Sequence, residues 1–316
     1  MPSNNDSLSG GLISLAGSTL DGQPLSFNRA PTPELRPFVS RIYATNMLAE
    51  SDNRVECGII SDMPAVRFIF GGHWQGRSEH GDVDHGRGVF FYGPQTRRLP
   101  ATVTGGFSTV SVLFQPGALA AMNGPAVEDY LDRMAPLNAA WDGQDPGLID
   151  RFSPDEPVTT WIERAEGWLL DLVRRVGAPP PDPLTAAFDR ASLVDPNIRI
   201  TDFSELHGIS PRTLSRRITR DFGLSPKRVL RRARALDLAA SLRGLAPDGE
   251  RDLPSMKYYD QSHMIREFSE ICDTTPGVFA TTPQPILTMT LETRQMRRLE
   301  ALGILQPGQT PPWRRA

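Results

Sequence analysis

The spacing of apolar residues along the chain changes near residue 116. Before it, apolar residues form short runs such as VRFIFGGHW (66–74), GVFFYGP (88–94) and FSTVSVLFQP (107–116), which are separated by Gly and Pro. Runs rich in Val, Ile, Phe and Tyr between such turns are typical of short β-strands. Residues 38–115 therefore predict a small β-sandwich or barrel.

After residue 116 the apolar residues recur at helical spacing. In TTWIERAEGWLLDLVRRV (159–176) one helix face carries Trp161, Ala165, Trp168, Leu169 and Leu172. This amphipathic pattern predicts a long helix. Two interpretations of the apolar face stay open, namely a dimer contact and a contact with the helix's own β domain.

A chain of 316 residues is long enough for two domains. Residues 1–37, rich in Ser, Asn, Gly and Pro, predict a loose lead-in, followed by a β-rich domain with a helical extension over 38–176. The prolines of GAPPPDP (177–183) predict a stiff linker, because they cannot continue a helix. A helical domain is expected over 184–283. In the tail, 284–316, TLETRQMRRLEALGI has a helical pattern and receives no role.

Composition is ordinary for a soluble protein, with 39% hydrophobic and 22% charged residues. There is no apolar run long enough to cross a membrane, and MPSNNDSLSG lacks the basic and apolar parts of a signal peptide, so we expect a cytoplasmic protein without a membrane partner. Cys57 and Cys272 lie far apart in the sequence. This spacing argues against a disulfide framework and predicts two buried thiols.

Although the net charge of the chain is −3, basic residues are concentrated in one stretch. Between residues 211 and 234, one acid, Asp221, accompanies nine bases: Arg212, Arg216, Arg217, Arg220, Lys227, Arg228, Arg231, Arg232 and Arg234. Such a stripe on an otherwise acidic chain indicates a nucleic-acid partner. The alternative is a solvated helix face, but such faces usually interleave acids with bases.

The stripe begins inside TDFSELHGISPRTLSRRITRDFG (201–223). Gly208 supplies a tight turn, Ser210 and Pro211 form a helix start, and Gly223 forms a helix stop. A small core is predicted from Phe203, Leu206, Ile209, Leu214 and Ile218. Two helices joined by such a turn are typical of a helix-turn-helix, whose second helix enters the major groove of DNA.

Burial of one face of this second helix leaves its opposite face for DNA. Base reading is therefore predicted for Arg212, Ser215 and Arg216, because Arg can bind guanine in a bidentate manner. Phosphate contacts, which fix register without reading sequence, are predicted for Arg217, Arg220, Lys227 and Arg231.

Two long motifs then carry a family resemblance. ISPRTLSRRITRDFGLSPKRVLRRARALDLAASL (209–242) and YYDQSHMIREFSEICDTTP (258–276) resemble the DNA-binding domain of the AraC/XylS family of bacterial transcription regulators, in the right order and spacing. The resemblance covers about 100 residues, 184–283. It implies two helix-turn-helices joined by a long helix, with both recognition helices in successive major grooves. It also implies an N-terminal sensing and dimerising domain, often a small β-barrel of cupin type.

In the second motif Asp260 is expected to cap a helix. Its core side is predicted to consist of Met264, Phe268 and Ile271. Its groove side is predicted to consist of Gln261, Ser262, Ile265 and Arg266, where Gln can pair with adenine and Ile can touch a thymine methyl. A catalytic role for His263 is the alternative, but no nucleophile motif lies near it.

The second motif also departs from the family pattern. Lys257 and Tyr258 stand where the family usually has a glycine and an aromatic, and Pro254 falls in the preceding helix, where it removes a backbone donor. Asp273 stands where a C-cap glycine is common, a milder change because Asp can adopt left-handed conformations. These departures leave the docking geometry of the second unit open.

Two groups of residues in the β-rich half could have a specific function. His73, His80 and His85 lie among acids and could be ligands of a metal, although their spacing is not a tight ligand motif and their surroundings resemble a hairpin loop. An effector pocket or a packed core is possible for the aromatic residues Phe68, Phe70, Trp74, Phe90, Phe91 and Tyr92.

The sequence is thus interpreted as an α+β protein: a small cupin-like β-barrel domain with helices, followed by an all-α DNA-binding domain. Its predicted function is effector-responsive, sequence-specific transcription regulation, without enzymatic activity, cofactor or bound metal. Its candidate partners are double-stranded DNA, a small-molecule effector, a second copy of the chain in a homodimer, and RNA polymerase. The alternatives are a cupin-like metalloenzyme with a helical appendage and a scaffold that lost operator binding.

Overall fold

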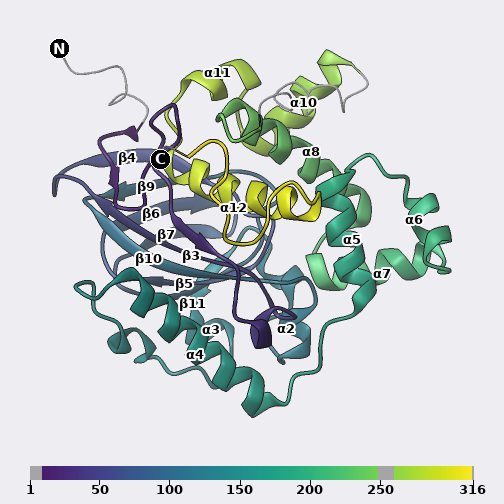
Figure 1. The fold of residues 1–316 in the computed structure, drawn as a ribbon, viewed down its shortest axis with the longest axis horizontal. Coiled ribbons are helices and arrows are strands. Elements are labelled where there is room, and N and C mark those ends of the chain that lie inside the picture. The colour runs from purple at the N-terminus through teal and green to yellow at the C-terminus, as the bar shows by residue number, and fades with distance from the viewer. Residues whose placement is uncertain (1–8, 248–259, 315–316) are drawn as a thin grey trace.

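The computed structural model describes residues 9–247 and 260–314. The first half of the chain forms two antiparallel sheets (Figure 1). The larger sheet has the order β1-β3-β10-β5-β8-β11, with β2 also paired to β3: β1 (Ile13–Ser14), β2 (Phe27–Arg29), β3 (Val39–Leu48), β5 (Ala65–Ile69), β8 (Gly88–Tyr92), β10 (Phe107–Phe114) and β11 (Met134–Pro136). The smaller sheet has the order β4-β9-β6-β7: β4 (Arg54–Ile59), β6 (His73–Ser78), β7 (Gly81–His85) and β9 (Leu99–Thr104).

The two sheets pack face to face. Val55, Trp74 and Val103 of the smaller sheet share one apolar cluster with Met47 and Phe107 of the larger sheet. The rings of Trp74 and Phe107 meet edge to face, with centroids 4.8 Å apart. Within the described residues no strand of one sheet pairs with the other. The predicted β-rich domain is confirmed, as a sandwich whose sheets are not closed into a barrel.

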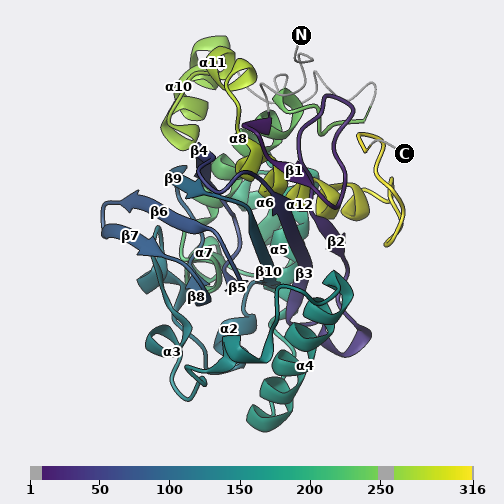
Figure 2. The same ribbon diagram turned by 90° about the vertical axis from the view of Figure 1, so that its left-hand side faces the viewer.

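The long amphipathic helix α4 (Val158–Val176) covers the other face of the larger sheet (Figure 2). Trp161 and Leu169 are fully buried there, and the Trp161 ring lies 4.9 Å from that of Phe70. The apolar face of α4 therefore packs on its own β domain. Short helices surround this region: η1 (Pro33–Leu35), α2 (Ala118–Ala121), η2 (Val127–Tyr130), α3 (Leu137–Ala140) and η3 (Leu148–Arg151).

The prediction of a loose N-terminal segment is wrong for residues 9–37. Strands β1 and β2 both pair with β3, so their backbone donors and acceptors are satisfied in the sheet. Leu25 is fully buried in a cluster with residues of the helical half. Positive φ angles at Gly10, Gly11, Gly17 and Gly22 suit the turns before and after β1.

The second half is helical, and its described helices are α5 (Pro183–Val194), α6 (Ile200–Leu206), α7 (Pro211–Phe222), α8 (Pro226–Leu242), α10 (Gln261–Cys272), α11 (Pro276–Thr281) and α12 (Pro285–Ala301). The helices predicted within 201–223, over the basic stretch that follows and after Asp260 are confirmed, whereas the helix expected around Pro254 lies outside the described residues. The predicted order, a β-rich domain followed by helices, agrees with the layout that the AraC/XylS resemblance implies. None of the described helices is long and apolar enough to cross a membrane.

The C-terminal segment is an integral part of the fold, contrary to its interpretation as a tail. Helix α12 lies between the sandwich and helices α5 and α8 (Figure 1). Leu291 and Leu299 pack among residues of α8 and α10, whereas Ile286 and Met289 belong to the cluster between the sheets. Beyond α12 the buried Trp313 donates its indole N–H to Glu292 over 3.1 Å. The end of the chain thus joins the two halves.

Both cysteines are buried, as the sequence predicts. Burial raises the pKa of the Cys57 thiol to about 12, and it raises the pKa of the Cys272 thiol to about 12 as well. Neither thiol is ionised near neutral pH, so both act as small apolar side chains.

Candidate nucleic-acid interface

The first helix-turn-helix consists of α6 and α7. Gly208 has a φ of +62°, which permits the tight turn between the two helices. Ser210 Oγ accepts a hydrogen bond from the backbone N–H of Thr213 over 3.1 Å and caps α7, which ends at Gly223 with a φ of +69°. The start and stop signals in the sequence therefore act as predicted.

A compact apolar core fixes the angle between these helices. Phe203, Leu214 and Ile218 are buried in it, and the Phe203 ring lies 5.1 Å from that of Phe188 on α5. The predicted core position of Leu206 is wrong, because its side chain is 77% exposed. Helix α6 ends at Leu206, and the turn brings Ile209 against the core instead.

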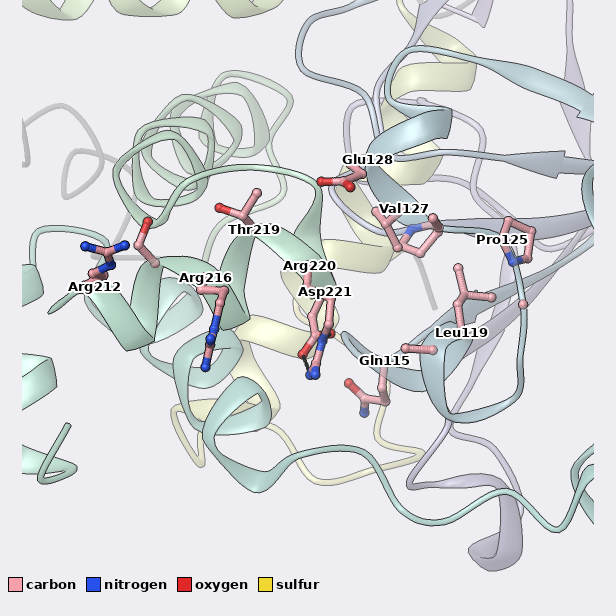
Figure 3. A pocket seen from close by; sticks show the side chains of 16 residues that line it. Gln115, Leu119, Pro125, Val127, Glu128, Arg212, Arg216, Thr219, Arg220 and Asp221 are labelled. Atoms are coloured by element: carbon pink, nitrogen blue, oxygen red, sulfur yellow. Dashed lines mark hydrogen bonds and ion pairs between the residues drawn. The ribbon is translucent and has the colours of Figure 1, made fainter. Parts of the chain in front are cut away.

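The predicted base-reading side of α7 faces a cleft. Arg212 and Arg216 are exposed and Ser215 is half-buried, and neither arginine forms an ion pair within the described part of the chain. The cleft measures about 710 Å³, and its opposite wall includes Leu119 and Pro125 of the β-rich half (Figure 3). Two unpaired guanidinium groups thus face a space that another molecule can enter.

Two of the arginines that were predicted to contact phosphate form ion pairs with carboxylates of the protein. Arg217 Nη1 lies 2.9 Å from Asp182, and Arg220 Nε lies 2.6 Å from Asp221. The Asp221 side chain is fully buried and also accepts a hydrogen bond from Thr185 Oγ1 over 2.7 Å. The hydrogen bond to Asp221 raises the pKa of Arg220. Asp221, the single acid of the stripe, is therefore an internal anchor of α7.

Of the basic residues on helix α8, some are exposed and others are buried. Lys227 is exposed and forms no ion pair among the described residues, whereas Arg231 pairs with Glu267 over 3.2 Å and with Glu270. Hydrogen bonding to Glu270 raises the pKa of Arg231. Arg232 is buried, which lowers its pKa to about 10, and it donates to two backbone carbonyls of the β-rich half.

Two bases of the stripe, Arg232 and Arg234, are directed to partners inside the protein. Arg232 faces the sandwich, and Arg234 Nη2 lies 2.9 Å from the buried Glu267. Helix α8 packs against α5, α7, α10, α11 and α12, so only a narrow side of it remains for a ligand.

Helix α10, the predicted second recognition helix, begins at the expected residue. Asp260 Oδ1 accepts from the backbone N–H of His263 over 2.7 Å. Phe268 and Ile271 are buried, and Asp273 ends the helix with a φ of +56°. The predicted groove side is exposed at all four positions: Gln261, Ser262, Ile265 and Arg266. Pro254, Lys257 and Tyr258 lie outside the described residues.

Comparisons with known proteins give one family match and several similar solved structures. Residues 28–136 match a family described as a domain of unknown function, DUF6597. Among solved structures, ToxT from Vibrio cholerae is 8% identical, with 76% of this chain and 97% of that chain covered and a TM-score of 0.45. A ToxT structure bound to an unsaturated fatty acid is 11% identical, with coverages of 83% and 97% and a TM-score of 0.41.

The AraC-like transcriptional activator CuxR is 17% identical, with coverages of 67% and 86% and a TM-score of 0.28. A search of curated proteins gives no match. Identities this low assign no role to any residue of this chain.

The three histidines of the β-rich half lie on a β-hairpin formed by β6 and β7. His73 Nε2 lies 3.3 Å from Asp84 Oδ1, whereas His85 stacks on Phe90 with centroids 4.1 Å apart. Burial lowers the pKa of His85. Across residues 9–247 and 260–314 there is no group of three or more His, Cys, Asp or Glu side chains that could hold a metal ion.

The aromatic residues considered for an effector pocket mostly form the core. Phe68, Phe70 and Phe91 are buried under α4. Trp74 and Tyr92 also line a space of about 50 Å³ between the sheets. Next to Tyr92 lies Arg67, whose guanidinium is centred 4.5 Å above the Tyr92 ring. In the sequence, only the presence of Arg67 in the otherwise apolar run VRFIF indicated a charged side chain inside the sandwich.

Sequence reasoning missed an ionic network where the two halves meet. Arg294 of α12 lies 3.1 Å from Asp62, which follows β4, and 2.5 Å from Asp237 of α8. Arg297 of α12 lies 2.6 Å from Asp189 of α5. Burial alone would raise the pKa of Asp62, but the charges of Arg294, Arg297 and Arg232 together hold it below its usual value. Asp62 is therefore ionised at neutral pH and binds α12 to the sandwich.

Proposed function

We propose that this protein is a sequence-specific DNA-binding transcription regulator of the AraC/XylS type. The observation that carries the proposal is the pair of N-capped helices, α7 and α10, which expose Arg212 and Arg216 on one and Gln261 and Arg266 on the other. Helix α8 packs against both of them. Two exposed polar helix faces held by one long helix suit insertion into two successive major grooves.

Within this proposal the residues divide by chemistry. The arginines of α7 bind guanine edges, and Gln261 binds an adenine edge, because these side chains offer matching pairs of hydrogen bonds. Lys227 contacts phosphate. Arg217, Arg220 and Arg231 can do so only by exchanging or sharing a carboxylate partner, so they contribute less than the sequence alone suggests.

The β-rich half is proposed to control access to this surface. The cleft in front of α7 is lined on one side by the recognition helix and on the other by residues 115–128. A small-molecule effector or a second copy of the chain that changes the relation of the halves would shift the population able to dock on DNA. Contact with RNA polymerase is the proposed route from docking to transcription.

The test is selection from a pool of random duplexes by the full-length chain, followed by affinity measurements across a salt series. We expect an enriched sequence motif and a steep loss of affinity with salt, because bound phosphates release counterions. Binding without any enriched motif would refute sequence-specific recognition. Absence of duplex binding at low salt would refute the proposed function altogether.

Two substitutions separate base reading from phosphate binding. Arg212→Ala is expected to weaken binding to the selected duplex by about 1–3 kcal/mol and to relax preference at one base pair. Lys227→Ala is expected to weaken binding to all duplexes similarly and to lower the salt slope by about 1. Both are measured by fluorescence anisotropy on the selected duplex and its single-base variants. Equal losses on every duplex for both variants would show that Arg212 is not a base-reading residue.

A further inference from the structure

The loop between β8 and β9, residues 93–98, fastens the sandwich to the long helix α8 and to α10. The backbone N–H of Arg98 donates to the carbonyl of Ile271 on α10 over 2.7 Å. Arg232 of α8 donates to the carbonyl of Gln95 over 2.9 Å. One loop of the β-rich half is thus held between the long helix and the second recognition helix.

Beside this loop lies a cleft of about 270 Å³ with walls from both halves of the protein. Arg97 and Glu79 of the sandwich face Arg228 and Arg231 of α8 and Glu270 of α10 across it. The β6–β7 hairpin, whose turn carries Glu79, reaches out on the left of Figure 2, the side on which α10 also lies.

The cleft lies close to the helices that are proposed to bind DNA. Arg228 and Arg231 lie in the first two turns of α8, which starts four residues after α7 ends, and Glu270 lies in the last turn of α10. The cleft therefore lies beside the start of α8, the helix that joins the two proposed recognition helices, and the end of α10. If α7 and α10 enter successive major grooves as proposed, the phosphates of the intervening minor groove would lie near this cleft.

The charges in the cleft favour an anion. Arg97 pairs with Glu79 and Arg231 pairs with Glu270, while Arg228 forms no ion pair among the described residues. The two carboxylates are exposed, with side-chain exposures of 72% and 65%. Exposed ion pairs are weak because water and salt screen them, so a phosphate can displace a carboxylate from its arginine at small cost and gain charge-assisted hydrogen bonds.

We propose that Arg97, a residue of the β-rich half, binds a backbone phosphate of the DNA together with Arg228. Glu79 is the intramolecular competitor for Arg97. The sandwich is then part of the DNA-binding surface itself, in addition to its proposed regulatory role. This inference rests on the proposed DNA binding and adds a contact that the helical half does not contain.

Two variants of one ion pair test the proposal, because they separate a phosphate contact from a structural pair. Arg97→Ala removes the cation, so affinity of the full-length chain for every duplex should fall, and the salt slope should decrease by about 1. Glu79→Gln removes the competing carboxylate, so affinity should rise and the slope should become steeper. If the Arg97–Glu79 pair served only to hold the β6–β7 hairpin in place, both variants would change the affinity for DNA in the same direction.

The matched control is Arg174→Ala on α4, which breaks another exposed pair, with Glu34, and should leave affinity and slope unchanged. Circular dichroism and urea unfolding verify that all variants fold alike. If the wild-type chain selects a motif but Arg97→Ala binds like it, or if both pair variants weaken binding, this inference fails and the proposed function stands. If the wild-type chain binds no duplex, both fail.

Discussion

A chain that ends at Pro283 is expected to lose the cooperative folding of its helical half. The cut removes Leu287, Leu291, Met296 and Leu299, which are buried against α8, α10 and the start of the chain. Full burial of such side chains contributes about 1.5–3 kcal/mol each, or about 6–12 kcal/mol for four. This loss equals most of the roughly 5–15 kcal/mol by which a protein is stable.

Urea unfolding followed by circular dichroism and tryptophan fluorescence checks this result. The full chain should unfold in a sharp transition, whereas the shortened chain should show a broad transition at low urea. Leu291→Ala should give an intermediate loss of about 2–5 kcal/mol, because it leaves a cavity in the same core. Ile304→Ala is the control, since this side chain is 51% exposed. A shortened chain with the transition of the full chain would show that α12 is an accessory element.

The local features of the helical half were predictable from the sequence because each depends on neighbouring residues. Ser210 and Asp260 cap helices through N–H groups three residues away, and Gly208 and Gly223 adopt the left-handed conformations for which glycine is suited. The exposed sides of α7 and α10 follow from helical periodicity once Leu214 and Phe268 are placed in a core.

The role of α12 was not predictable in this way. Its charged residues suggest a solvated surface helix, yet Glu292, Arg294 and Arg297 are buried. They are buried because carboxylates and arginines far away in the sequence, such as Asp62 and Arg314, meet them in space. Burial of a charge depends on its partner, and the spacing of residues along one helix holds no information about a partner on another element.

The same reason explains why the sequence overstated the positive charge that the basic stripe presents at the surface. Nine bases with one acid in 24 residues suggested a surface for DNA, but the acids that neutralise Arg231 and Arg234 lie on α10, more than 30 residues further along. The contact between Arg97 and Glu79 was likewise invisible, because it joins a loop and a hairpin turn within the β-rich half. Charge counted along the sequence overstates the charge that a ligand meets.

Asp237→Ala is expected to destabilise the protein by about 3–5 kcal/mol, although no DNA contact is assigned to this residue. The Asp237 side chain is 1% exposed, and its carboxylate lies 2.5 Å from Arg294 and 3.9 Å from Arg298, both of which are also buried. Removal of the carboxylate leaves buried positive charge with too few partners. The free energy of unfolding, measured with urea at neutral pH, should fall accordingly.

Two further variants distinguish this cause from a general intolerance to substitution. Asp145→Ala breaks an exposed pair with Arg151 and a turn hydrogen bond from the backbone N–H of Gly147, and should change the free energy of unfolding by less than about 1 kcal/mol. The double variant Asp237→Ala with Arg294→Met removes the uncompensated charge together with its former partner, so its loss should be smaller than the sum of the two single losses. Strictly additive losses would mean that Asp237 and Arg294 do not stabilise one another.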